Sequence, residues 1–189
     1  MNEFIKNYTE DVKYLLEYSV KKNILHILNL KNNILISKKK KSKIILVGNG
    51  GSAATSSHVA VDLTKNAKVR AINFNEADLI TCFANDFKYE NWVQKALEMY
   101  SDRNDFIILI SASGNSKNIL KAAYWLKKKK IKFATLTGMK SNNLLKKLNS
   151  KAVNIWINSM SYNKVEIIHH YILLLIIDLI IDEQKRYNL

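Results

Sequence analysis

Continuous apolar runs alternate along this chain with segments in which apolar residues have helical spacing. Short, largely apolar runs occupy residues 43–48, 67–74, 105–113, 132–138 and 151–158. Between these runs apolar residues recur every three to four positions, which is the period of an amphipathic helix. Strands with little polar alternation that are separated by helices are typical of a parallel sheet covered on both faces. The pattern therefore predicts an α/β fold with a five-stranded parallel sheet flanked by helices.

The two ends of the chain are expected to be helical. Two stretches within residues 2–36 have helical spacing, so we expect two helices that form an N-terminal helical extension with a role in oligomerisation, as domain 1–36. Residues 37–189 then form one α/β domain, since no linker or internal repeat divides them. The last helix, at about 163–183, is apolar nearly all round, and burial of such a helix against a second copy predicts a homo-oligomer.

Composition narrows the class of protein. The longest apolar run, 171–181, contains Asp178 and is too short to span a bilayer. The first 18 residues carry acids and lack the apolar core of a secretory signal. The single cysteine, Cys82, excludes an internal disulfide and a cysteine-based zinc site, and it is expected to be buried in an apolar helix. We therefore expect a cytoplasmic protein that does not associate with membranes.

The formal net charge of +14 has two interpretations. It could indicate binding to nucleic acid, or it could reflect lysines at solvated helix ends. The charge is densest in "SKKKKSK" (37–43) and "LKKKKIK" (126–132), each just before a strand, where cations complement a helix dipole. Arginine is scarce and aromatic residues do not interleave with the lysines, so nucleic acid is not expected as a partner.

A glycine-rich loop follows the first predicted strand. The stretch "GNGGSAATSSH" (48–58) contains three of the five glycines in the chain. Glycine lets the backbone come close to a ligand, and the helix that follows offers free N–H groups to an anion. The loop lacks the Gly-Lys-Ser/Thr of a P-loop, and no acidic residue ends the second strand as in a dinucleotide-binding fold.

A serine-rich loop follows the third strand, in "ISASGNSKN" (110–118). Hydroxyl and amide donors at the start of a helix suit a phosphate group. One such loop is more often a simple helix cap. Two loops at the carboxyl ends of strands in one sheet, where ligands of open α/β folds bind, favour a phosphorylated ligand.

The motifs "GNGGSAATSSHVAVDLTK", "FANDFKYE", "LISASGNSKNILKA" and "LTG" together resemble the SIS (sugar isomerase) domain. The similarity is to its phosphoheptose (sedoheptulose-7-phosphate) isomerase group and extends in order over nearly the whole chain. It implies a three-layer, flavodoxin-like fold, usually a homotetramer with sites at subunit interfaces. The implied reaction converts sedoheptulose 7-phosphate to a glycero-manno-heptose 7-phosphate for the heptose of lipopolysaccharide or capsule.

The resemblance also implies site residues. Those expected to contact the sugar phosphate are Asn49, Gly50, Gly51, Ser52, Asn85, Asp86, Ser111, Ala112, Ser113 and Ser116. His58 and Asp62 match a His–Glu pair of the family, with a shorter carboxylate. Glu166 and Leu174 stand where the family has glutamine and histidine. Because leucine cannot bind a metal ion, the family's zinc site is incomplete, with His58 as its candidate ligand.

Three mechanisms remain open. In the first, Glu166 is the base and His169 or His170 opens the sugar ring, with Asp62 as a further candidate catalytic residue. In the second, His58, Asp62 and Glu166 hold a metal ion together with water. In the third, catalysis is lost and the protein is a regulator that binds the replication initiator or senses a phosphosugar; a DNA-binding protein is a further alternative. Retention of both loops and of Glu166 favours the isomerase.

Overall fold

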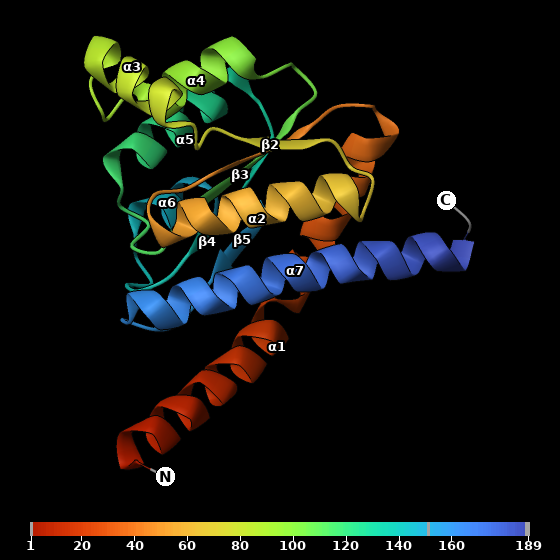
Figure 1. The fold of residues 1–189 in the computed structure, drawn as a ribbon, viewed down its shortest axis with the longest axis vertical. Coiled ribbons are helices and arrows are strands. Elements are labelled where there is room, and N and C mark those ends of the chain that lie inside the picture. The colour runs from red at the N-terminus through yellow and green to blue at the C-terminus, as the bar shows by residue number, and fades with distance from the viewer. Residues whose placement is uncertain (1, 151, 188–189) are drawn as a thin grey trace.

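The computed structural model describes residues 2–150 and 152–187 and contains one five-stranded parallel sheet (Figure 1). Its strand order is β2-β1-β3-β4-β5. The strands are β1 (Ile44–Val47), β2 (Ala71–Asn73), β3 (Phe106–Ser111), β4 (Phe133–Thr137) and β5 (Asn154–Trp156). The predicted fold class is confirmed. The order reverses between β1 and β3, which is the point where ligands bind in open α/β sheets.

Helices cover both faces of the sheet. One face packs against α1 (Glu3–Lys39), α2 (Gly51–Lys65) and α7 (Tyr162–Tyr187). The other packs against α3 (Ala77–Phe87), α4 (Trp92–Tyr100), α5 (Lys117–Lys129) and α6 (Leu144–Leu148). In β1, Ile44 and Leu46 belong to the first core and Ile45 and Val47 to the second. Because successive strand residues point to opposite faces, a sheet covered twice requires the continuous apolar runs seen in the sequence.

The N-terminal region is one helix, so the expectation of two helices was wrong. Helix α1 continues for 37 residues because residues 3–39 include neither glycine nor proline to break it. Its second half lies in the core, with Ile27, Leu30 and Ile34 fully buried. Its first half extends away from the sheet (Figure 1).

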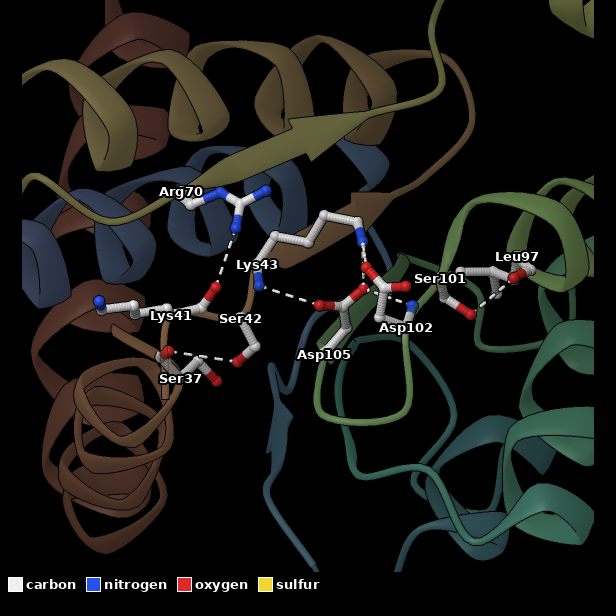
Figure 2. A network of polar contacts seen from close by, with 9 residues as sticks. All are labelled: Ser37, Lys41, Ser42, Lys43, Arg70, Leu97, Ser101, Asp102 and Asp105. Atoms are coloured by element: carbon white, nitrogen blue, oxygen red, sulfur yellow. Dashed lines mark hydrogen bonds and ion pairs between the residues drawn. The ribbon is translucent and has the colours of Figure 1, made fainter. Parts of the chain in front are cut away.

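A polar network joins the end of α1 to the amino ends of β1 and β3 (Figure 2). The Lys43 ammonium lies 2.6 Å from carboxylate oxygens of both Asp102 and Asp105. Asp105 is buried and also accepts hydrogen bonds from the backbone N–H groups of Lys43 and Asp102. Burial alone would lower the pKa of Lys43, but the two carboxylates outweigh it and the pKa is raised.

Helix α3 is the least enclosed of the helices around the sheet. None of its residues is buried, and its apolar side chains, such as Phe83, are only partly covered by the second core. Cys82 is exposed, which corrects the expectation that it is buried, since it lies away from the side of α3 that contacts the core. Within the described ranges, no helix is long and apolar enough to cross a membrane.

Candidate functional site

The glycine-rich loop connects β1 to α2 and brings a carboxylate against the helix start. Gly50 has φ +55°, a backbone conformation that glycine adopts without strain. A Cβ on Gly51 would lie only 2.2 Å from Glu166 Oε2 of α7. The absence of a side chain at Gly51 therefore lets the Glu166 carboxylate approach the first turn of α2, where the helix dipole favours negative charge. The sequence predicted that the backbone at Gly50 and Gly51 comes close to a ligand. In the structure, the group that comes close to Gly51 is the Glu166 carboxylate of the same chain.

The serine-rich loop connects β3 to α5 and is supported from behind by Asn143. Gly114 has φ +64°, and a Cβ there would lie 2.1 Å from Asn143 Oδ1. Asn143 is buried and donates to the backbone carbonyls of Gly138 and Lys140. The hydroxyl oxygens of Ser111 and Ser116 lie 3.1 Å apart. The loop is thus held in a fixed shape with two hydroxyls side by side.

Two asparagines join the glycine-rich loop to α5. The side-chain amides of Asn49 and Asn118 exchange two hydrogen bonds, of 3.0 and 2.9 Å. The Tyr89 hydroxyl also donates to Asn49 Oδ1, at 3.4 Å. A cavity of about 500 Å³ adjoins this pair and is lined by Lys88, Tyr89, Glu90, Lys117 and Asn118. Asn118 was missed from the sequence, although an asparagine on an otherwise apolar helix face was the available signal.

Two histidines and an aspartate lie further along α2 and α7, which run side by side (Figure 1). His58 Nδ1 lies 2.8 Å from His170 Nε2, and His58 Nε2 lies 3.4 Å from Asp62 Oδ2. His170 is one helical turn beyond Glu166, so the carboxylate and this imidazole share a face of α7. Burial and the charge of His58 lower the pKa of His170, and Asp62 opposes them.

The structure places His169 in the core, away from His58. Its side chain is fully buried, and its Nε2 lies 3.0 Å from the Thr137 carbonyl oxygen. Burial lowers the pKa of His169 to about 4, against the smaller opposing effect of the Thr137 carbonyl. Of the two neighbouring histidines, His170 lies beside the α2 residues and His169 is buried against the end of β4.

Asn85 and Asp86 lie on the exposed surface of α3. The amide of Asn85 donates to Asp86 Oδ1 at 3.0 Å. Among the described residues, no hydrogen bond joins either side chain to the glycine-rich or serine-rich loop. The structure therefore brings together the candidates from both loops, α2 and α7, and leaves those of α3 apart from them.

The residues of one chain do not fit the zinc site of the family. Within 2–150 and 152–187, no group of three or more His, Cys, Asp or Glu side chains could hold a metal ion. His58 directs one ring nitrogen at His170 and the other at Asp62, and the predicted set of His58, Asp62 and Glu166 does not converge on one point. Leu174 packs against the apolar core.

Comparison with known proteins identifies the family of this chain. A family model of the SIS domain matches residues 7–138. A phosphoheptose isomerase of Buchnera aphidicola is 32% identical over 193 aligned positions, covering 99% of this chain and 93% of the relative. A phosphoheptose isomerase of Helicobacter pylori is 40% identical over 96 positions, about half of each chain.

Solved structures share the fold. The phosphoheptose isomerase of Neisseria gonorrhoeae superposes with a TM-score of 0.87 at 21% identity, covering 94% of this chain and 98% of that one. The enzyme of Francisella tularensis has the same TM-score at 20% identity, with 95% and 97% covered. The match to the domain model and to relatives along almost the full length shows that this chain belongs to the SIS-domain family, in its phosphoheptose isomerase group.

Proposed function

We propose that this protein is a phosphosugar ketose–aldose isomerase that converts sedoheptulose 7-phosphate to a glycero-manno-heptose 7-phosphate. The observation that carries the proposal is the Glu166 carboxylate, held against Gly51 at the switch point of the sheet. The serine-rich loop follows β3, the strand next to β1. The names of the relatives, all phosphoheptose isomerases, support this substrate class.

The residues present suit each part of the reaction. Isomerisation needs a base that moves a proton between C1 and C2 through an enediolate, and we assign this role to the Glu166 carboxylate because it lies against Gly51. Ser111 and Ser116 would exchange their mutual contact for hydrogen bonds to the phosphate, helped by the start of α5. Lys88 and Lys117 add positive charge to the adjoining cavity.

Ring opening needs a group that passes a proton to or from the ring oxygen. We assign this step to His170, because it shares a face of α7 with Glu166 and contacts His58 and, through it, Asp62. Its lowered pKa favours the neutral imidazole, which both accepts and donates a proton near pH 7. His169, the other candidate, would have to leave its buried position to take part.

The proposal extends to assembly and cell biology. Several large apolar side chains on α1, among them Phe4, Tyr14 and Leu25, are exposed. Covering them would favour a homo-oligomer, for which the family precedent is a tetramer, with α1 in the interface. The exposed Asn85 and Asp86 would then complete the site of a neighbouring subunit. We further propose a cytoplasmic enzyme that supplies heptose for lipopolysaccharide or capsule.

Incubation with sedoheptulose 7-phosphate in deuterated water, followed by NMR, tests the activity. An isomerase produces the aldose and exchanges deuterium at the carbons that share the enediolate. Absence of both product and exchange would overturn the proposal for this substrate. If the sugar phosphate still bound, the result would support the alternative of a regulator that senses a phosphosugar without turning it over.

Substitution of Glu166 tests its role as the base. Glu166→Gln keeps the size of the side chain but removes the basic carboxylate, so turnover should be lost while phosphosugar binding by calorimetry remains. Glu183→Gln, a matched change near the other end of α7 where Glu183 pairs with Lys31, should retain activity. Full activity of Glu166→Gln would remove Glu166 as the base.

A further inference from the structure

The two lysine-rich tracts of the sequence meet at the amino ends of the strands, at the opposite end of the sheet from the two loops. Tract 37–43 ends α1 and tract 126–132 ends α5, and both reach the amino ends of β3 and β4. A cavity of about 600 Å³ lies there and adjoins a smaller one of about 140 Å³. The cations that line the two cavities are Lys40, Arg103, Lys127, Lys130 and Lys132.

This positive charge is not neutralised within the described part of the chain. None of the five cations forms an ion pair there, and the only acid lining either cavity is Asp105. Asp105 is already bound by the Lys43 ammonium and by two backbone N–H groups (Figure 2). Like charges gathered around a hollow repel one another, and an anion in the hollow would remove that repulsion.

The dipole of α5 explains only part of this clustering. It favours cations in the last turn of the helix, which includes Lys127, but Lys130 and Lys132 lie beyond the helix end. Lys130 also has φ +57°, a conformation that glycine or asparagine adopts at lower cost. Glycine can therefore replace Lys130 without straining the backbone, which removes the charge from the cavity.

The remaining lining suits a molecule larger than a simple ion. The asparagines Asn29, Asn33 and Asn149 supply amide groups, and Phe106 and Phe133 form part of an apolar wall. A volume of about 600 Å³ falls in the range of small-molecule sites, about 300–1,000 Å³. The charge is gathered in a hollow with a single arginine, which fits a compact ligand better than an extended strand of nucleic acid.

We propose that this cavity binds a phosphorylated small molecule of nucleotide size, at a site separate from the phosphosugar site. Helix α5 begins beside the serine-rich loop and ends at the cavity, and its 13 residues span about 20 Å. Both sites can therefore be occupied at once. The proposal does not depend on whether the protein is an isomerase.

Calorimetric titration of the full chain with ATP, and separately with inorganic pyrophosphate, tests the proposal. Lys130→Gly removes one positive charge from the cavity, and glycine adopts the positive φ at this position at lower cost than lysine, so the variant should fold. We expect it to weaken ATP binding about tenfold, as the loss of one charge-assisted hydrogen bond implies. Lys68→Gly is the matched control, because Lys68 also has positive φ, at +56°, but lines neither cavity.

Saturating sedoheptulose 7-phosphate should leave ATP binding unchanged. Tighter binding of ATP than of pyrophosphate would support contacts to the nucleoside, and equal binding would support recognition of the phosphates alone. Equal ATP affinity in Lys130→Gly and the unaltered protein, or displacement of ATP by the phosphosugar, would overturn the proposal. The proposal would also be overturned if the protein bound neither ATP nor pyrophosphate and bound only a DNA or RNA oligonucleotide, with an affinity that falls as salt rises.

Discussion

The contact between Gly51 and Glu166 allows the placement of the carboxylate to be tested without removing it. In Gly51→Ala, the new Cβ would lie 2.2 Å from Glu166 Oε2 and 2.6 Å from its Cδ. These atoms belong to the end of a flexible side chain, so the carboxylate can swing away. To restore an ordinary contact of 3.4 Å, the oxygen must move by about 1.2 Å.

A shift of this size should affect catalysis far more than stability. A misplacement of about 1 Å of a reacting group can reduce the rate by about 100-fold, so we expect a fall in kcat of that order. Alanine is a better helix former than glycine by up to about 1 kcal/mol, so the melting temperature should hold or rise slightly. Gly48→Ala is the contrasting variant, because its Cβ would meet the backbone carbonyl group of Ser52 at 2.7 Å and should destabilise the fold.

The assay measures formation of the aldose from sedoheptulose 7-phosphate beside thermal unfolding of each variant. An unchanged kcat in a well-folded Gly51→Ala variant would refute the inference that the carboxylate acts from its present position. A large loss of stability in that variant would refute the inference that the side chain of Glu166 yields to the new methyl group.

Three further predictions concern buried groups. His169 has a pKa of about 4 in the folded state, below the ordinary value of 6.5, so as the pH falls the unfolded state binds a proton first. The free energy of unfolding should therefore fall by about 3 kcal/mol between pH 6.5 and pH 4. Urea titrations at a series of pH values should show this loss in the unaltered protein and not in His169→Leu. Asn118→Ala should raise KM about tenfold in steady-state kinetics, because Asn49 loses both of its hydrogen bonds to Asn118 and keeps only the 3.4 Å bond from the Tyr89 hydroxyl; an unchanged KM would contradict this. Lys43→Met should lower stability by about 3 kcal/mol in chemical denaturation, because Asp105 stays buried without its cation; a smaller loss than from Lys39→Met would contradict it.

The alternation of apolar runs and helical spacing was enough to predict the sheet, because a strand buried on both faces needs consecutive apolar residues such as Ile44 to Val47. The helix count at the N-terminus was not predictable from spacing alone. Ser19 and Asn23 are polar residues close to where the two expected helices would meet, but both are buried, and Asn23 bonds the backbone of Trp156 at the sheet edge. A local pattern cannot reveal a polar partner 133 residues away.

The sequence by itself determined the fold class and the two loops, since both depend on residues close together along the chain. Tertiary structure alone decided which distant groups meet. It placed Glu166 against Gly51 and His170 beside His58, and it buried His169, although the two histidines are adjacent in the sequence. Neighbours on a helix point about 100° apart, so α7 directs His170 toward α2 and His169 toward the end of β4, where it is buried. The same long-range packing brought the two lysine-rich tracts to one cavity.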